Sequence, residues 1–319
     1  MSETNSNLPA IDVHGLVKRF RKHKAVDGLS MTIPPGTAFG FLGPNGAGKT
    51  TTLKLLMGLL RRDAGDVSVL GLDPAVDDVG VKLRVGYVPE QQFIYRWMRV
   101  SDAIRFCKPL YPTWNDDRGN ELLKLFALDA GKKVKHLSKG NVVKLALLLA
   151  MAHEPELLIL DEPMAGLDPL VRDDLLDGVL RTLCDRERTL VFSSHTMADV
   201  QRMADRIGII DEGTLLYDGP IDVLLNGTKR IRAVLANGSN GGEPPDGTIC
   251  HRVVDREWLI TVRDFSQDKV SRLVAGGGVS RVDVLDLNLE EIFKDYIRGR
   301  RGGRTETASS SMTYGEVRS

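Results

Sequence analysis

A glycine-rich stretch that ends in a lysine and a threonine stands early in the chain. The residues from Gly43 to Thr50, GPNGAGKT, fit the pattern G-x-x-x-x-G-K-[ST] in full. Glycines let successive backbone N–H groups turn toward phosphate oxygens, a lysine brings positive charge to the β- and γ-phosphates, and a hydroxyl can ligate Mg²⁺. The motif therefore predicts a triphosphate site, with Lys49 also active in catalysis and Thr50 on the metal. Its expected members are Gly43, Pro44, Asn45, Gly46, Ala47, Gly48, Lys49, Thr50 and Thr51.

Two adjacent acids, Asp161 and Glu162, end the apolar run 157–160. Open α/β sheets bind their ligands at the carboxyl ends of the strands, where these acids are expected. We therefore expect Asp161 to hold the metal and Glu162 to act as general base toward an attacking water. Adjacent acids also commonly cap a following helix, but a complete phosphate loop elsewhere in the chain favours the catalytic interpretation.

A second polar loop, Ser138-Lys139-Gly140-Asn141, begins a helix that is apolar on nearly every face. Ser138 could serve only as an N-cap that accepts a hydrogen bond from a backbone N–H group two or three residues later. The same helix end could instead bind an anion, because its free N–H groups and the positive end of its dipole point outward. These residues alone leave both interpretations open.

The elements that position these motifs follow from hydrophobic patterning. Short apolar strands alternate with helical stretches, which predicts a parallel sheet covered by helices. Residues 207–210 and 215–217 form a hairpin around an Asp-Glu-Gly turn. The remaining strands are expected at 11–20, 29–33, 38–42, 67–70, 84–88, 157–160 and 190–193, with a helix at 49–60 and mostly helical structure at 100–152.

The composition of the chain changes after Pro220. Strands at 231–235, 249–254, 258–262 and 282–285 surround a Gly- and Pro-rich loop at 237–247, with a helix at 266–274. A last helix begins at Asn288, and Glu291 completes a capping box. The predicted organisation is a disordered N-terminus (1–9), a nucleotide-binding domain (10–225) with a helical subdomain at about 92–152, a small α+β domain (226–299) and a disordered tail (300–319).

Composition excludes several classes of protein. The 319 residues carry 43 Lys+Arg and 43 Asp+Glu, so no net charge draws the chain to nucleic acid, and no nucleic-acid partner is expected. No apolar run approaches the ~20 residues of a membrane span, and the polar N-terminus lacks the features of a signal peptide. Three scattered cysteines, Cys107, Cys184 and Cys250, show no metal-ligand spacing and fit a reducing cytoplasm.

Together these motifs resemble the ATP-binding subunits of ATP-binding-cassette (ABC) transporters over roughly residues 10–220. The signature loop of that family, usually LSGGQ, corresponds to LSKGN at 137–141, and GLDP at 166–169 resembles its D-loop. The resemblance implies that Phe20 stacks on adenine and that His195 contacts the γ-phosphate and the catalytic water. The metal-contacting glutamine of the Q-loop aligns with Glu90, and Gln91 follows one position later, so either residue is a candidate metal contact.

The resemblance also implies an architecture and partners. The fold class is α/β: a P-loop NTPase cassette with a mixed core sheet, a helical subdomain and antiparallel N-terminal strands, plus a small α+β C-terminal domain. Two cassettes, identical or paralogous, stack head to tail, so that Ser138 and the N–H of Gly140 in one donate to the γ-phosphate held by the other. The implied cofactors are ATP and Mg²⁺.

A separate transmembrane permease is the other implied partner, which places the chain in the cytoplasm on the inner face of the cell membrane. Phe93, Tyr95 and Trp97 are expected to be exposed for docking to it. The stretch 287–293 resembles the C-terminal extension of cassettes that serve ABC-2-type exporters. The alternative is a soluble ABC-type regulatory ATPase without a transport role.

Overall fold

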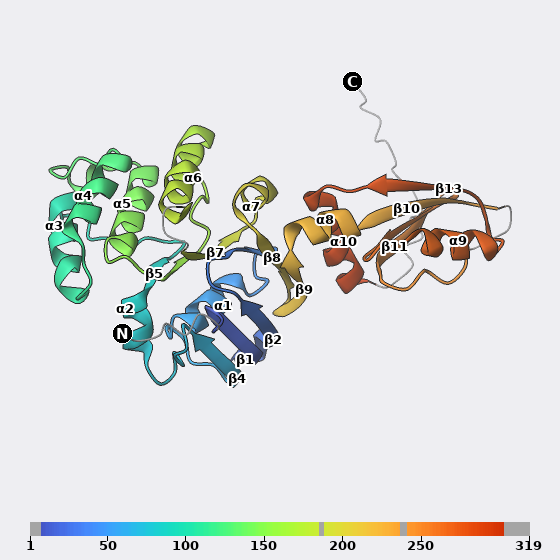
Figure 1. The fold of residues 1–319 in the computed structure, drawn as a ribbon, viewed down its shortest axis with the longest axis horizontal. Coiled ribbons are helices and arrows are strands. Elements are labelled where there is room, and N and C mark those ends of the chain that lie inside the picture. The colour runs from blue at the N-terminus through green and yellow to red at the C-terminus, as the bar shows by residue number, and fades with distance from the viewer. Residues whose placement is uncertain (1–7, 185–187, 237–240, 303–319) are drawn as a thin grey trace, which may run out of the picture. The chain divides into compact units, whose positions relative to one another are not determined.

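The computed structural model describes residues 8–184, 188–236 and 241–302 (Figure 1). The chain divides into two compact units, Met1–Ile221 and Asp222–Ser319, close to the boundary expected after residue 225. Most of the two terminal segments expected to be disordered (1–7 and 303–319) and part of the Gly-rich loop (237–240) lie outside the described residues. At the C-terminal end the last helix continues through Arg301.

A six-stranded sheet forms the centre of the first unit. Its strands are β3 (Ala38–Leu42), β5 (Val85–Val88), β6 (Leu157–Leu160), β7 (Thr189–Ser194), β8 (Arg206–Asp211) and β9 (Thr214–Pro220). Their order is β5-β6-β7-β3-β8-β9; the first five are parallel, and β9 pairs antiparallel with β8. Every residue of β6 and β7 is buried, as expected where helices cover both faces. The predicted mixed core sheet is confirmed.

An antiparallel sheet of β1 (Ile11–Phe20), β2 (His23–Ile33) and β4 (Ala64–Val69) shares one hydrophobic core with the central sheet and with α1 (Lys49–Leu56). Strand β2 begins six residues earlier than expected, because it pairs with β1 along its whole length. Helix α1 ends at Leu56 and not at residue 60. The chain turns at Gly58, whose φ is +64° and where a Cβ would lie 2.8 Å from the carbonyl oxygen of Pro74.

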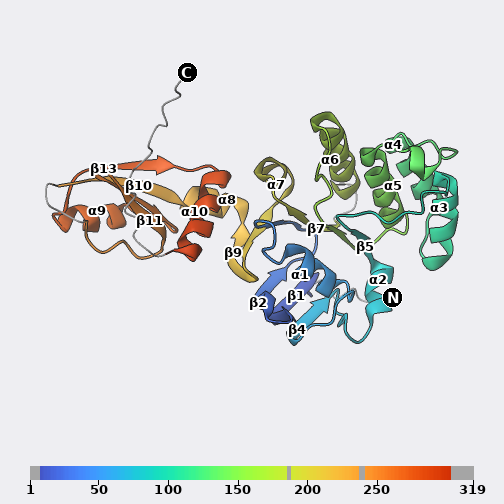
Figure 2. The ribbon, with the colours of Figure 1, turned by 180° about the vertical axis from the view of Figure 1, so that it is seen from behind.

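The helical region between β5 and β6 is broken into several pieces. Both views of the ribbon show α3, α4 and α5 gathered together beside β5 (Figures 1 and 2). Its elements are α3 (Val100–Cys107), η1 (Lys108–Leu110), α4 (Asp116–Leu125), η2 (Val134–His136) and α5 (Lys139–Met151), preceded in the chain by α2 (Asp78–Arg84) before β5. Helices α6 (Pro169–Cys184) and α7 (Met197–Met203) follow β6 and β7.

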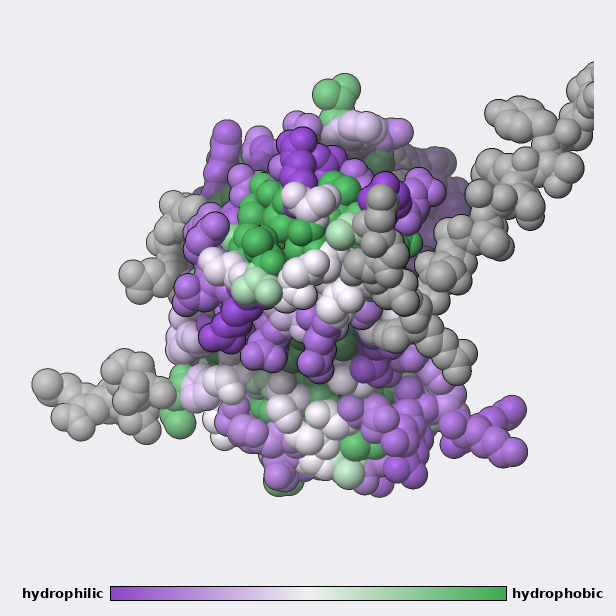
Figure 3. All heavy atoms as spheres, turned by 90° about the vertical axis from the view of Figure 1, so that its right-hand side faces the viewer, coloured by the Kyte–Doolittle hydropathy of each residue, from purple (hydrophilic) through white to green (hydrophobic). Residues whose placement is uncertain are grey.

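The second unit is a small α+β domain. Its antiparallel sheet has the order β11-β12-β10-β13, formed by β10 (Lys229–Leu235), β11 (Thr248–Val254), β12 (Glu257–Val262) and β13 (Val279–Asp286). Helix α8 (Ile221–Gly227) leads into it, and α9 (Gln267–Ala275) and α10 (Leu289–Arg301) complete it. Asn288 and Glu291 form the predicted capping box. On the face of the molecule shown in Figure 3, a patch of hydrophobic side chains is bordered by hydrophilic ones.

A buried carboxylate ties α10 to the sheet of this unit. Asp295 accepts hydrogen bonds from Arg230 at 2.7 Å and from the Thr261 hydroxyl at 2.6 Å. Because both partners belong to strands of the sheet, the bonds fix the helix against it. Within the described part of the chain, no helix combines the length and the apolar character that crossing a bilayer requires.

Candidate nucleotide-binding site

The glycine-rich loop connects β3 to α1 and folds tightly against its neighbours. Gly48 has a φ of +109°, and a Cβ there would lie 2.4 Å from the carbonyl oxygen of Ala25 in β2. At Gly43 a Cβ would lie 2.5 Å from the carbonyl oxygen of Ile210 in β8. Only glycine permits this close approach of three backbone segments. The loop is therefore held in place by both sheets.

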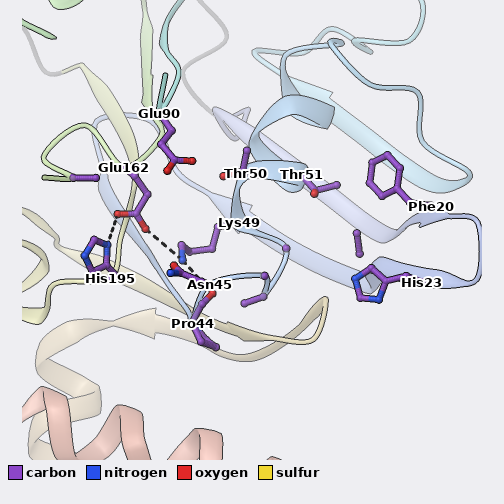
Figure 4. Close-up of a pocket in the computed structure, with 15 residues that line it drawn as sticks. Phe20, His23, Pro44, Asn45, Lys49, Thr50, Thr51, Glu90, Glu162 and His195 are labelled. Carbon is purple, nitrogen blue, oxygen red and sulfur yellow. Dashed lines mark hydrogen bonds and ion pairs between the residues drawn. The ribbon is translucent and has the colours of Figure 1, made fainter. Parts of the chain in front are cut away.

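Lys49 begins α1 and is only 6% exposed. Its ammonium donates to the carbonyl oxygens of Gly43 at 2.6 Å and Pro44 at 3.3 Å, so it folds back over the loop that precedes it. The same Nζ lies 3.4 Å from Oε1 of Glu162 (Figure 4). The lysine is thus positioned at the centre of the loop, with its charge partly offset by a carboxylate.

Asp161, at the carboxyl end of β6, is fully buried. Its Oδ1 accepts hydrogen bonds from the hydroxyls of Thr50 at 3.0 Å and Ser193 at 2.8 Å, whereas its Oδ2 is buried without a hydrogen-bond partner. Burial raises the pKa of Asp161, the charges of Glu90 and Glu162 raise it further, and the two hydroxyls oppose the shift. An unpartnered, buried carboxylate oxygen beside a threonine hydroxyl is a suitable donor set for a hard cation.

Glu162 has a left-handed backbone conformation, with a φ of +46°. Its N–H donates to the hydroxyl of Ser193 at 2.8 Å, and its Oε2 lies 2.7 Å from Nδ1 of His195 (Figure 4). A non-glycine residue in this conformation is strained, and such strain is common where a side chain is held for function. Here the conformation aims the carboxylate between Lys49 and His195.

A pocket of about 550 Å³ is lined by Lys49, Thr50, Glu162 and His195, whereas Asp161 is not among its lining residues. Figure 4 shows Glu162 and His195 near one end of it and Phe20 with His23 near the other. Phe20 is 46% exposed, so it is not a core residue of its strand. Glu90 lines the pocket, and Gln91 does not. The full lining is Phe20, His23, Ala25, Pro44, Asn45, Gly46, Ala47, Gly48, Lys49, Thr50, Thr51, Glu90, Glu162, Ala165 and His195.

The signature loop does not line the pocket of its own chain. Ser138 is the N-cap of α5, and its hydroxyl accepts a hydrogen bond from the N–H of Asn141 at 3.3 Å, so the capping interpretation is confirmed. The next residue, Lys139, donates from Nζ to the carbonyl oxygen of Ala165 at 2.6 Å. At Gly140 a Cβ would lie 2.4 Å from a methyl group of Val171 in α6.

Sequence reasoning missed several residues around this site. Ser193 bonds both acids, and its only signal in the sequence is its place at the end of a buried strand beside the acidic one. His23 and Ala25 line the pocket from β2 without any motif of their own. In the described residues there is no group of three or more His, Cys, Asp or Glu side chains that could hold a metal ion without phosphate oxygens.

Comparison with known proteins gives consistent results. The family described as ABC transporter matches residues 26–165. An uncharacterised ABC transporter ATP-binding protein of Bacillus subtilis is 36% identical over 89% of this chain and 97% of its own length. The daunorubicin resistance ATP-binding protein of Streptomyces coeruleorubidus is 36% identical over 89% and 94%. A Nod factor export ATP-binding protein of Burkholderia lata is 36% identical over 67% and 72%.

Solved structures agree on the fold. The ATP-binding subunit of an ABC transporter is similar with a TM-score of 0.61 and 26% identity, over 67% of this chain and 90% of that one. A dimeric bacterial ABC transporter cassette, at 20% identity, shares the fold with a TM-score of 0.60 over 66% and 98% of the two chains. With its complete phosphate loop and acidic strand end in one pocket, the chain belongs to the family of ABC transporter ATP-binding proteins, whose cassettes bind and hydrolyse ATP.

Proposed function

We propose that this protein is the ATP-hydrolysing subunit of an ABC-2-type exporter and that it works as a pair of cassettes. The observation that carries the proposal is that Lys49, Thr50, Glu162 and His195 line one pocket, with the buried carboxylate of Asp161 hydrogen-bonded to Thr50. Lys49 would bind phosphate, the oxygens of Thr50 and Asp161 would ligate a metal ion, and Glu162 would act as base. His195 adds an imidazole beside that base. Together these groups meet the requirements of phosphoryl transfer to water.

The lining of the pocket suits a nucleoside triphosphate. Phe20 offers an exposed aromatic face for the base at one end, and the glycine-rich loop holds the phosphates near the other. When phosphate enters, Lys49 exchanges its bonds to the loop carbonyls for bonds to the β- and γ-phosphates. This exchange also loosens its ion pair with Glu162, which frees that carboxylate to face water.

Magnesium fits the residues present. The Thr50 hydroxyl and Asp161 would hold it, and the buried, unpartnered Oδ2 of Asp161 supports this assignment. Glu90 is the better placed of the two candidate Q-loop residues, because it lines the pocket. When bound, the ion supplies positive charge that offsets the charge of the phosphate oxygens.

Hydrolysis requires a base beside the γ-phosphate. Glu162 accepts a proton from a water molecule, whose oxygen attacks the γ-phosphorus while the bond to the β–γ bridging oxygen breaks, giving ADP and inorganic phosphate. His195 holds the carboxylate through the 2.7 Å contact and can also reach the γ-phosphate. A positioned base of this kind contributes typically ~10²–10⁴-fold to the rate.

A second cassette completes the site. Ser138 and Gly140 lie outside the pocket of their own chain, at the N-terminal end of α5, a place suited to an anion; Ser138 is exposed and Gly140 is buried. Placed against the nucleotide of another copy, the Ser138 hydroxyl and the Gly140 N–H would donate to its γ-phosphate. ATP then bridges two cassettes, and hydrolysis removes the bridge. The dimeric cassette that shares this fold supports such a pairing.

An apolar groove offers a docking place for a permease on the cytoplasmic side of the membrane. It has a volume of about 360 Å³, and its lining includes Phe93, Cys107 and Tyr111. The predicted exposure of Phe93, Tyr95 and Trp97 is confirmed, since all three are more than half exposed. Exposed aromatic side chains are common anchors of protein interfaces. The relatives named for daunorubicin resistance and Nod factor export favour an exporter.

The variant Glu162→Gln tests the proposal. It should bind Mg-ATP, accumulate as a nucleotide-bound dimer in size-exclusion chromatography, and hydrolyse ATP at least about 100-fold more slowly than the wild type. Glu154→Gln, a change of the same type at a glutamate outside the pocket, is the matched control. A monomer that stays monomeric with saturating Mg-ATP would contradict the paired cassette. Co-purification of a membrane protein separates the exporter from a regulatory ATPase without a transport role.

A further inference from the structure

Two segments of the helical subdomain lie side by side at its surface. The N–H of Lys135 donates to the carbonyl of Arg96 at 3.0 Å, and the N–H of Val134 donates to the carbonyl of Met98 at 2.9 Å. Arg99 and Lys133 face each other in an antiparallel bridge. The two segments therefore form a short two-stranded ribbon with fixed facing pairs.

In this ribbon the aliphatic side chains are buried and the charged side chains are exposed. Met98 and Val134 are buried and anchor the ribbon to the subdomain, whereas Arg99, Lys133 and Lys135 are exposed. Trp97 alternates with the buried Met98 and is 67% exposed. One face of the ribbon thus combines a tryptophan with several cations. We name the exposed set the cationic ribbon; it consists of Arg96, Trp97, Arg99, Lys132, Lys133 and Lys135.

The charges of the cationic ribbon are not balanced locally. Residues 93–139 contain ten lysines and arginines and five acids, in a chain with 43 of each. Among the described residues, no carboxylate forms an ion pair with any cation of the ribbon. Of the two nearest acids in the sequence, Asp102 accepts from the backbone N–H of Arg99 and forms its ion pair with Arg105 at 3.6 Å, outside the ribbon, and Asp129 accepts from the N–H of Gly131.

An aromatic row continues from the ribbon. The rings of Tyr95 and Trp97 stack with centroids 5.9 Å apart, and Tyr95 meets Phe106 edge-on at 6.4 Å. Tyrosine and tryptophan favour the headgroup level of a bilayer, where the ring is partly desolvated and its polar atom stays wet. Exposed lysines and arginines beside them are attracted to acidic lipids. This combination favours a lipid surface over an acidic polypeptide or a nucleic acid.

We propose that the cationic ribbon binds the anionic headgroups of a lipid bilayer directly. The proposal deepens the proposed function, since the neighbouring groove, lined by Phe93, is the docking place suggested for the permease. Lipid contact would hold the rim of that groove at the membrane while a permease segment enters it. It requires neither nucleotide nor a second cassette, so it is tested separately from the ATPase.

The test uses the purified full-length chain and vesicles without permease. Vesicles of phosphatidylcholine with about 30% phosphatidylglycerol should bind the chain in sedimentation assays and shift its tryptophan emission to the blue, whereas pure phosphatidylcholine should not. The variant Trp97→Phe should lose this shift, although Trp114 and Trp258 remain. Binding should fall steeply in about 0.5 M salt, because the attraction is screened. The triple variant Lys132→Glu/Lys133→Glu/Lys135→Glu should lower the partition coefficient at least about 100-fold.

A matched triple variant controls for net charge. Arg61→Glu/Lys124→Glu/Arg272→Glu reverses three exposed cations outside the ribbon and should bind as the wild type does. Circular dichroism and ATP hydrolysis should be unchanged in both triple variants, which shows that each is folded. Three outcomes overturn the proposal: no binding to anionic vesicles, equal loss in the two triple variants, or equal affinity for single-stranded RNA at the same ionic strength.

Discussion

The phosphate pocket and the signature loop are held in very different ways. Around Asp161 and Glu162 the side chains contact one another at 2.7–3.4 Å within one chain, with Lys49 and Asp161 buried and His195 exposed. Ser138, at the tip of α5, is exposed, and among the described residues its hydroxyl makes one long capping bond of 3.3 Å. The pocket is therefore organised within one chain, whereas the hydroxyl of Ser138 at the start of α5 can still donate a hydrogen bond to another group.

This difference bears on catalysis. Donors that are already oriented stabilise developing charge without reorganising during the reaction, which describes the pocket. The free N–H groups of a solvent-exposed helix end donate hydrogen bonds to water until an anion replaces the water. The proposed pairing therefore combines two kinds of region: a pocket whose side chains are held within one chain, and a helix end whose exposed serine makes only a capping bond among the described residues.

The largest effect is expected from the variant Ser138→Asp. Aspartate is as good an N-cap as serine, so the unfolding free energy should change by less than ~0.5 kcal/mol. Its charge would repel a γ-phosphate, and ATP hydrolysis should fall at least about 100-fold, the scale of losing one well-placed donor. Steady-state ATPase assays and urea unfolding measure the two effects. If Ser138→Asp hydrolyses ATP at the wild-type rate, the only role of Ser138 is to cap α5.

A mixture of two inactive variants tests whether Ser138 acts on the nucleotide of another copy. In a pair made of Ser138→Asp and Lys49→Met chains, one of the two composite sites combines an intact lysine with an intact serine. The mixture should therefore recover hydrolysis that neither variant has alone. If mixing restores nothing although the variants still pair, the loop and the signature tip do not meet across two chains.

A change of intermediate size is expected from pH. Because the folded-state pKa of Asp161 lies above its usual value of 3.8, its proton competes with Mg²⁺. As pH falls below that raised pKa, metal affinity should drop about tenfold per pH unit. The free energy of unfolding of the metal-free protein should rise as pH falls through the same range, since protonation removes the buried charge. Calorimetric Mg-ATP titrations between neutral and acid pH measure the first effect, and Asp161→Asn should abolish it.

The smallest effect concerns the contact between the two regions. Lys139→Met removes the bond from the signature loop to the Ala165 carbonyl, and Ala165 lines the pocket. The bond is exposed and worth ~1 kcal/mol or less, so hydrolysis should change by about two- to fivefold. Lys139→Arg keeps a donor and should behave as the wild type. Identical rates for all three proteins would show that the regions are independent at this point.

Much of the pocket could be predicted because most of its functional residues belong to short, contiguous sequence motifs. The spacing from Gly43 to Thr50 defines a loop by itself, and the acids after an apolar strand are assigned by the edge of the sheet at which they lie. Ser193 could not be assigned to the acids, because its role depends on β7 lying beside β6. The early end of α1 was also missed, since it depends on Gly58 meeting a distant carbonyl.

Gly140 is constrained by the interior of its own chain. A methyl group added there would fall 2.4 Å from a Val171 methyl, well inside van der Waals distance. Enlarging this residue would push the first turn of α5 away from α6 whether or not another molecule is present. Loss of activity after such a change would report altered helix packing, so position 138 is the cleaner place to probe contact between copies.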